Sequence, residues 1–526
     1  MFGMVVLKHI FMHQKQQKQT YKSLIQTSII AGLGGTLFYL LISFNGIGIS
    51  PDSVSYLATA KNIASGKGIT DYNNSPLVLF PAGYPLFLGF ILKLTGCNLL
   101  TIAKVINATL MISLVFFYGL IIDKFKNKNT FWLYKLIILI SIPISASMLD
   151  VYTMLWSETL FIVLIPVFVL LIYRYLQIPT IANLLIVALI SAIACDVRIA
   201  GISIIGTGLA IIALQNSFTI KKKLRDCSIY FMLSSSIIVL NIIRNNFLSG
   251  SMAGIRQKSE TSFFANIDYV GNTILQWFHL IITFKYLGLL LGISVMSLLL
   301  GIILWKLLLN KTFSSIELIT TLFCFFYFGF IILSSTLSKY EPINNRLLSP
   351  AFVPFLISIT LFIPNSLSMI RRTIYLKYMI VGIVTITTIF FEYGQLEYCV
   401  TLFDETKESG IPGYTEKSWQ ESNIVQFLTD KKQVDTNLSS EIPIYSNAAD
   451  AVYFYSSRNA TNLPETAHTT KLSDYCGSGT NYIVWFTNEF DYKAIVRLED
   501  ISLHRYLDTL KSFKDGYLLI SKPFLR

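Results

Sequence analysis

The sequence predicts an α-helical integral membrane protein with about eleven spanning helices and a small C-terminal α/β domain. Of its 526 residues, 53% are hydrophobic and only 14% are charged, whereas about 25% of residues are charged in typical globular proteins. Apolar runs of about 20 residues, long enough to cross the hydrocarbon core, recur along the first three quarters of the chain. Such runs must be helices, because lipid offers no partners to backbone amides.

The predicted spans follow one another through short connections, apart from the long loops after the first and the seventh. In chain order they cover residues 24–44, 101–122, 132–148, 156–175, 182–194, 199–214, 228–243, 286–309, 316–335, 347–363 and 378–391. These bounds predict a cytoplasmic tail at 1–23, a membrane domain at 24–396 with its first outer loop at 45–100, and an extracytoplasmic domain at 397–526.

The net charge of +12 is explained by topology. Basic residues gather before the first span and then on every second connection, as the positive-inside rule requires: Lys15, Lys18, Lys22, Lys124, Lys126, Lys128, Arg174, Lys221, Lys222, Lys223, Arg225, Lys306, Lys311, Arg371, Arg372 and Lys377. This pattern predicts a multi-pass protein of the plasma (inner) membrane with a cytoplasmic N-terminus and an outer C-terminal domain. It also argues against a nucleic-acid partner.

The C-terminal residues differ in character from the spans. Short β-prone runs at 442–445, 482–486 and 517–520 alternate with helical patterns at 416–428 and 449–455. Such alternation is typical of a small α/β domain with a parallel sheet.

The first outer loop carries the most informative acidic residue, Asp52. Ser50 suits a helix N-cap and Pro51 the first helical position, so a helix is expected to begin here and lie on the membrane surface. A second amphipathic piece at 81–94 is too short to span. Asp52 either complements the dipole of the first helix or serves as a general base at the lipid–water boundary.

Glu158 is expected at the outer end of the fourth span, at about the depth of Asp52. Acidic residues at a membrane boundary are costly unless they are paired or solvated, which makes them functional candidates; the alternative is a glutamate that only starts a helix. Asp196 and Arg198 lie in the next outer turn and could pair with each other.

Cations on the same outer side run against the positive-inside trend. Arg244 ends the seventh span, and Lys339 and Arg346 bracket the start of the tenth. They either extend to lipid phosphates or hold the phosphate of a lipid-linked donor as it leaves. Carboxylates and cations at one depth suit the transfer of a sugar from a polyprenyl phosphate, which needs no nucleotide. The chain has no P-loop or GxGxxG fingerprint.

At these residues the chain resembles the polytopic GT-C glycosyltransferases, in particular relatives of protein O-mannosyltransferases and of the aminoarabinose transferases that act on lipid A. The resemblance rests on short motifs in order along nearly the whole chain: Asp52-Ser53 with Tyr56, Gly83-Tyr84-Pro85, Ser157-Glu158, Arg198, Arg244-Asn245, Arg346 to Pro350, Ile444 to Asn447, Tyr453 to Arg458 and Leu463-Pro464.

The resemblance implies an inverting glycosyltransferase that moves a sugar from a polyprenyl-phosphate donor to an extracytoplasmic glycolipid, polysaccharide or protein. Asp52 would be the catalytic acidic residue, Glu158 a second acidic residue of the pocket, and Arg346 a phosphate contact. The substrate-binding residues would further include Tyr56, Tyr84, Arg198, Arg244 and Lys339. No metal site or cofactor is predicted from the residues, although some relatives bind a divalent metal.

Three other functions fit a polytopic chain. A polysaccharide polymerase or ligase also uses lipid-linked sugar, but relies on a late outer loop rich in Arg and His. A transporter or flippase would place ionisable residues or Gly/Pro breaks in mid-span, whereas the charges here fall at outer ends. A non-catalytic scaffold is the third.

Overall fold

The structure is a computed structural model that describes residues 2–125, 131–250, 258–280, 284–309, 313–339, 341–369, 374–465, 469–487 and 495–524. The chain divides into two compact units. Unit 1 comprises Met1–Ser43, Val78–Tyr84 and Ile102–Glu405, and unit 2 comprises Phe44–Leu77, Pro85–Thr101 and Thr406–Arg526. Most of the first outer loop therefore belongs to the same unit as the C-terminal residues. Lys126, Lys128, Lys311, Arg371 and Arg372, on which the predicted topology partly rests, lie outside the described residues.

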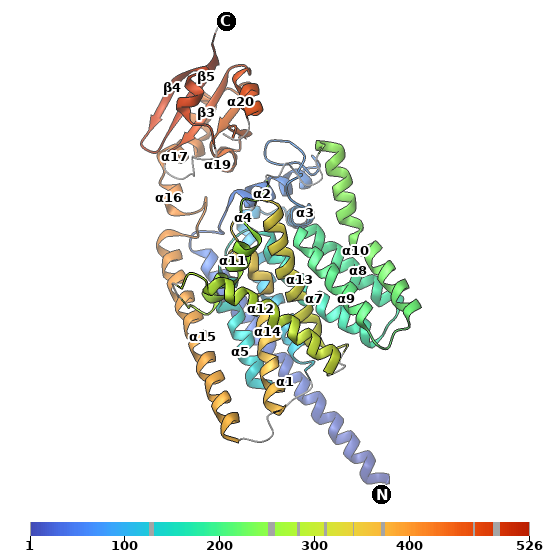
Figure 1. Cartoon of the computed structure of the whole chain (residues 1–526). Coiled ribbons are helices and arrows are strands. Elements are labelled where there is room, and N and C mark those ends of the chain that lie inside the picture. The colour runs from blue at the N-terminus through green and yellow to red at the C-terminus, as the bar shows by residue number, and fades with distance from the viewer. Residues whose placement is uncertain are drawn as a thin grey trace. The chain divides into compact units, whose positions relative to one another are not determined.

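Unit 1 is built of helices (Figure 1). They are α1 (Phe2–Ser43), α4 (Leu99–Ile122, which begins in unit 2), α5 (Phe131–Ile144), α6 (Ala146–Tyr152), α7 (Ser157–Gln177), α8 (Ile181–Val197), the 3-10 turn η1 (Ile199–Gly201), α9 (Ile202–Leu214), α10 (Ile220–Ser249), α11 (Phe263–Trp277), α12 (Leu287–Leu304), the π-helical turn η2 (Trp305–Leu309), α13 (Ile316–Leu337), α14 (Asn345–Met369) and α15 (Ile374–Ser409). Nearly every residue of the eleven predicted ranges falls in these helices. α11 was not predicted.

Seven helical segments of the described chain are long and apolar enough to cross a membrane: Tyr21–Ser43, Leu99–Ile122, Ser157–Gln177, Ile220–Ser249, Leu287–Leu308, Ile316–Leu337 and Tyr378–Ser409. The predicted third span is bent by 43° between Trp132–Ile144 and Ala146–Tyr152, and it makes an eighth if it is counted as one span. Pro143 removes a backbone donor near this break, and Ser145 then caps α6 by accepting a hydrogen bond from the Met148 amide at 3.4 Å.

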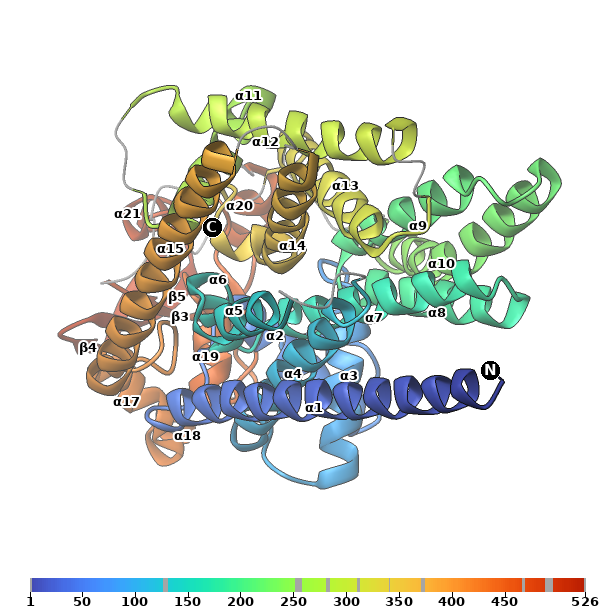
Figure 2. The ribbon, with the colours of Figure 1, turned by 90° about the horizontal axis from the view of Figure 1, so that it is seen from below.

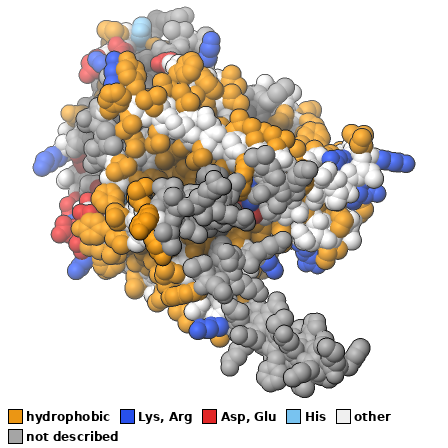
Figure 3. Space-filling model, turned by 60° about the horizontal axis from the view of Figure 1, so that its bottom comes forward, with side chains coloured by type: hydrophobic (Ala, Val, Ile, Leu, Met, Phe, Trp, Pro, Cys, Tyr) orange, Lys and Arg blue, Asp and Glu red, His pale blue; other side chains and the backbone are white. Residues whose placement is uncertain are grey.

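The helices of unit 1 pack so that α7 contacts both α8 and α14, while α8 also packs against α10 (Figure 2). Large apolar side chains remain exposed on the outside, among them Leu33 on α1, Leu240 on α10 and Ile386 on α15. Hydrophobic side chains cover much of the described surface in the view of Figure 3. A surface of this kind on long apolar helices is what contact with lipid requires.

Unit 2 combines loop helices with a small α/β fold. Its elements are α2 (Pro51–Ala64), most of α3 (Gly83–Thr95), α16 (Lys417–Gln420), α17 (Asn423–Thr429), α18 (Lys431–Asn437), β1 (Ile444–Ser446), α19 (Ala449–Ser456), β2 (Ala460–Asn462), α20 (Thr469–Cys476), β3 (Asn481–Phe486), α21 (Leu498–Ser502), β4 (Arg505–Phe513) and β5 (Gly516–Pro523). The helix expected at 416–428 is two helices, because Ser422 starts α17 as an N-cap.

The α2 helix begins as the sequence predicts. Ser50 is the N-cap, Pro51 is the first helical residue, and Ser50 and Ser53 form a reciprocal capping box. The α2 helix is more deeply buried within the protein than expected for a helix that lies on the membrane surface, because every residue from Ser53 to Ala60 is buried.

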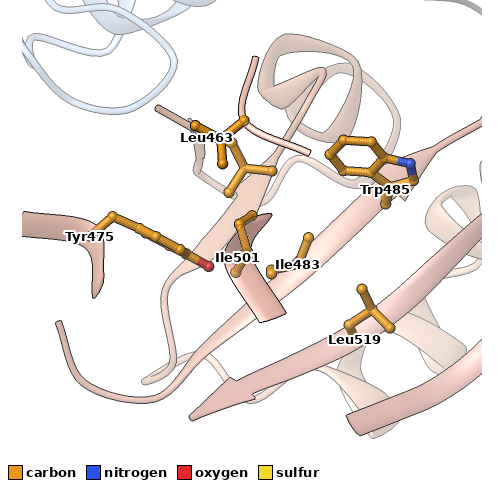
Figure 4. Packing of buried hydrophobic residues seen from close by; sticks show 7 residues of the cluster. Leu463, Tyr475, Ile483, Trp485, Ile501 and Leu519 are labelled. Atoms are coloured by element: carbon orange, nitrogen blue, oxygen red, sulfur yellow. The ribbon is translucent and has the colours of Figure 1, made fainter. Parts of the chain in front are cut away.

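The sheet of unit 2 has strand order β2-β1-β3-β5-β4. β1 pairs in parallel with β2 and β3, but β5 pairs antiparallel with both β3 and β4. The predicted parallel pairing is therefore correct for β1, β2 and β3 and wrong for β5, which is antiparallel to both of its neighbours. A core of Leu463, Tyr475, Ile483, Trp485, Val496, Ile501 and Leu519 covers one face (Figure 4).

Arg505, at the start of β4, is the most extensively bonded side chain of this sheet. It is 1% exposed, and its Nη1 donates to the carbonyls of Tyr475, Cys476 and Ser478 at 2.8–3.1 Å. Its Nε donates to Ser521 Oγ at 2.7 Å. The guanidinium thus joins the end of α20, where carbonyls lack helical partners, to β5.

We expect Arg505→Lys to destabilise the sheet of unit 2 by about 2–3 kcal/mol, because a lysine cannot serve carbonyls on two sides and leaves buried acceptors unsatisfied. Amide hydrogen exchange of β3 and β5 in the full chain measures the loss. Lys522→Met is the matched control on β5, since its ion pair with Asp508, at 3.5 Å, is exposed and such pairs contribute little. Equal protection in both variants would contradict this account.

Candidate active site

Glu158, on the first turn of α7, is the centre of an ion-pair cluster in unit 1. Its Oε1 lies 2.5 Å from Arg198 Nη1 and 2.6 Å from Arg346 Nε. The Glu158 side chain is fully buried, and the two arginine side chains are 16% and 17% exposed. One buried carboxylate therefore holds two guanidinium cations from the α8–η1 turn and from the start of α14.

The turn that carries Arg198 depends on two close backbone approaches. Arg198 itself is extended, with φ −148° and ψ 139°. A Cβ on Gly201 would lie 2.6 Å from the Cys195 amide nitrogen, and a Cβ on Gly83 would lie 2.6 Å from the Asp196 carbonyl oxygen. Only glycine fits at these two positions, so both residues set where Arg198 meets Glu158.

Arg346, the second residue of α14, is also held by an aromatic ring. Its guanidinium carbon lies 3.9 Å from the centroid of the Trp156 ring, and stacking of this kind fixes the plane of the cation. Glu341 lies 3.7 Å from Arg346 Nη1, but its side chain is 43% exposed, so this second carboxylate is screened by solvent.

Tyr84 is fully buried beside Thr159 and Glu158. Tyr84, Glu158, Arg198 and Arg346 were each singled out in the sequence, and the structure brings these four together. The expected pairing of Asp196 with Arg198 is wrong. Arg198 binds Glu158, whereas Asp196 accepts a hydrogen bond from Asn241 Nδ2 at 2.6 Å.

The other two predicted cations lie elsewhere on unit 1. Arg244, on α10, donates to Asn245 Oδ1 at 3.1 Å, and Asn245 Nδ2 donates to the Val78 carbonyl at 3.4 Å. Lys339 is exposed and follows Ser338, which forms a β-bridge with Lys258. Arg244 is thus near the segment that leads to Gly83, and Lys339 lies on a surface connection.

In unit 2, Asp52 is partly exposed on the first turn of α2, while Tyr56, one turn later, is only 3% exposed. Tyr56 is therefore a packed residue of α2. Two further acidic residues, Asp71 and Asp450, belong to segments that contact this helix. Ser55 Oγ donates to Asp71 Oδ2 at 3.1 Å, and α19, which carries Asp450, packs on α2.

Asp71 and Asp450 were not found from the sequence. Tyr414 OH donates to Asp450 Oδ2 at 2.6 Å, and the rings of Tyr72 and Tyr453 lie 5.7 Å apart. Burial raises the pKa of Asp450, with the charge of Asp52 adding to the effect, and burial likewise raises the pKa of Asp71. Of these residues only Tyr453 was part of a motif quoted from the sequence; Asp450 lies in the helix predicted at 449–455, but nothing in that pattern marked its carboxylate as a site residue.

Among the described residues, no three His, Cys, Asp or Glu side chains are grouped so as to hold a metal ion. Unit 2 offers a partly exposed carboxylate at Asp52, and unit 1 offers two largely buried arginines at Glu158. Guanidinium groups match phosphate oxygens in geometry and charge.

The structure is similar to two crystal structures of ArnT from Cupriavidus metallidurans. One is bound to undecaprenyl phosphate, with a TM-score of 0.55 and 9% identity, and the other is in the apo state, with a TM-score of 0.54 and 10% identity. Each alignment covers 94% of this chain and 97% of the ArnT chain. The chain has the ArnT fold. No family model matches the sequence, and no curated protein matches it.

The ArnT likeness extends over nearly the whole chain, so it includes both units. It confirms the predicted fold class of a polytopic helical protein with a small C-terminal sheet. At this identity the ArnT structures establish the fold and not the roles of individual residues.

We expect Glu158→Gln to destabilise unit 1 by about 3–5 kcal/mol, because it leaves two largely buried arginines without their counter-charge. Thermal unfolding of the full chain in detergent measures the change. Glu341→Gln is the matched control, since it removes an exposed carboxylate 3.7 Å from the same Arg346. If both variants shift the unfolding temperature alike, the Glu158 cluster stabilises unit 1 no more than an exposed ion pair does.

Asp450→Asn should make the stability of unit 2 less dependent on pH. Since the pKa of Asp450 is raised in the folded state from its ordinary 3.8, its contribution is fully present below 3.8 and is lost as pH rises through the raised value. An asparagine still accepts the Tyr414 hydroxyl and never ionises. The variant should therefore gain stability on the native chain as pH rises, and the two should converge in acid.

The measurement is amide exchange of α19 between pH 4 and 8, corrected for intrinsic rates. Asp435→Asn, which removes an exposed partner of Arg458, should leave the pH slope unchanged. Parallel curves for the native chain and Asp450→Asn would show that Asp450 does not titrate in this range.

Proposed function

We propose that the chain is a glycosyltransferase that moves a sugar from a polyprenyl-phosphate donor to a hydroxyl acceptor outside the cytoplasm. The observation that carries the proposal is the pair of arginines held at one buried carboxylate. It is supported by the fold shared with ArnT, a GT-C glycosyltransferase that acts on lipid A, one of whose structures holds undecaprenyl phosphate.

The reaction needs positive charge at the leaving group. As the bond between the sugar C1 and the phosphate oxygen breaks, that oxygen keeps the electron pair and its negative charge rises. Arg198 and Arg346 supply preorganised N–H donors for such an oxyanion, in a setting with little water. Glu158 orients both cations and is not itself the base, because its Oε1 already accepts from both guanidinium groups.

The reaction also needs a base for the acceptor. The acceptor oxygen attacks C1 from the face opposite the phosphate, which inverts the configuration, and its proton passes to a carboxylate. We assign this role to Asp52. Burial raises the pKa of both Asp450 and Asp71, which favours their neutral forms, and Asp450 is buried where it accepts from Tyr414. Asp52 lies on the first turn of α2, where it is partly exposed.

The predicted topology completes the proposal. The N-terminus is cytoplasmic, the protein lies in the inner membrane, and unit 2 with Asp52 faces outward to glycolipid, polysaccharide or protein acceptors. Arg244, near Val78, and the exposed Lys339 are proposed as outer contacts for anionic groups of these substrates.

Asp52→Asn should lower sugar transfer at least about a hundredfold, the smallest effect usual for a general base. The assay uses membranes that contain the full chain, a polyprenyl-phosphate sugar carrying a radiolabel, and extraction of the labelled acceptor fraction. Asp508→Asn, an exposed aspartate on β4, is the matched control and should transfer at the native rate. Native-rate transfer by Asp52→Asn would rule out this carboxylate as the base.

A further inference from the structure

A closed circuit of hydrogen bonds joins α6, α11, α14 and α15 within unit 1. Asp150 Oδ2 accepts from Asn345 Nδ2 at 2.6 Å, and Asp150 Oδ1 accepts from Tyr398 OH at 2.5 Å. Asn345 Oδ1 accepts from Trp277 Nε1 at 2.8 Å, and the Trp277 carbonyl accepts from Gln395 Nε2 at 2.6 Å. The circuit closes because Gln395 and Tyr398 both stand on α15.

The circuit fixes the first residue of α14. The side-chain amide of Asn345 donates to the Asp150 carboxylate, which can only accept, and its oxygen accepts from the Trp277 indole, which can only donate. These two partners allow only one orientation of the Asn345 amide. The backbone amide of Leu347 donates to Asn344 Oδ1 at 3.1 Å, which caps the same turn. The next residue after Asn345 is Arg346, whose Nε lies 2.6 Å from Glu158.

We propose that Asp150 and Asn345 are positioning residues that set where the Arg346 guanidinium meets the phosphate of a lipid-linked substrate; this inference rests on the proposed function. Arg346 reaches Glu158 from the start of a helix, so any rotation or slide of that turn moves its donors. Binding groups have to be held to about 0.5 Å to be effective, usually by a second layer of hydrogen bonds. Asp150 and Asn345 form that layer.

Stability alone does not explain the circuit. A carboxylate among membrane helices is expensive, and apolar side chains of similar volume often pack as stably as a buried polar network. Each polar atom of Asp150 and Asn345 named above is nevertheless satisfied, and the bonds converge on the turn that carries Arg346. A fully satisfied polar network makes its surroundings rigid, and here that rigidity fixes the position of a functional group.

The test exchanges the two positioning residues. Asn345→Asp alone sets two carboxylates against each other, so we expect undecaprenyl phosphate to bind about tenfold more weakly, equivalent to about 1.4 kcal/mol. The double variant Asp150→Asn with Asn345→Asp restores a donor facing a carboxylate. It can still accept from Tyr398 and Trp277, so it should recover native affinity. Binding is measured with the purified full chain in detergent.

Two controls separate positioning from general damage. Undecaprenol, which lacks the phosphate, should bind all variants equally. Ser141→Ala removes the hydrogen bond from Ser141 to Glu392 on α15, outside the circuit, and should leave affinity for undecaprenyl phosphate unchanged. If Asn345→Asp does not fold, Tyr398→Phe replaces it, because it removes one bond to Asp150; weaker phosphate-lipid binding at an unchanged unfolding temperature is expected.

The outcomes distinguish this inference from the proposed function. If Arg346→Gln weakens binding of undecaprenyl phosphate while Asn345→Asp or Tyr398→Phe does not, or if the exchange fails to restore it, the positioning role is overturned and the function stands. If the native chain does not bind the lipid, or Arg346→Gln binds it as well as the native chain, the proposed function fails and the inference falls with it.

Discussion

The pairing of Glu158 with Arg198 and Arg346 is the interaction on which the arrangement of unit 1 depends. It joins the start of α7, the turn after α8 and the start of α14 through one oxygen, at 2.5 and 2.6 Å. Loss of the carboxylate would leave two cations in a poorly hydrated place, which is far costlier than never having buried them. The three elements are thus bound to one another by charge as well as by packing.

Close backbone approaches at two glycines shape the turn that carries Arg198. Gly83 packs against the carbonyl of Asp196, and Gly201 folds back on Cys195. The approach at Gly83 brings Tyr84 beside Glu158, and the fold at Gly201 turns Arg198 back toward α7. Gly83 and Asp196, which are more than a hundred positions apart, meet through backbone contact at a glycine. Backbone contacts of this kind, and not side-chain complementarity alone, define the turn between α8 and α9.

Local features of the sequence predicted much of this structure. The apolar runs located the helices of unit 1, and Ser50 with Pro51 located the start of α2, since length and capping are decided within a few residues. The sequence also singled out Tyr84, Glu158, Arg198 and Arg346, which the structure brings together. It could not identify their partners: Arg198 pairs with Glu158 and not with the nearby Asp196, because the turn at Gly201 sets its direction.

The residues that the sequence missed depend on tertiary contacts. Asp71 and Asp450 become neighbours of α2 only when the loop and α19 pack on it, and neither stands in a motif that marks it. The same holds for the direction of β5, which is set by its hairpin with β4 and not by its own β-prone residues. α2 itself is buried on all sides, a property that its modest amphipathicity does not reveal.

A second cluster in unit 1 shows what distinguishes the one at Glu158. Asp226 is likewise buried, and it binds two cations, Lys222 at 2.7 Å and Arg225 at 2.8 Å. Those cations are 24% and 54% exposed, so water solvates their excess charge, and the cluster serves to anchor the start of α10. Arg198 and Arg346 are only 16% and 17% exposed. Because attraction to an anion grows as water is removed, the positive charge at Glu158 is less screened than the positive charge at Asp226, and a phosphate would gain more from it.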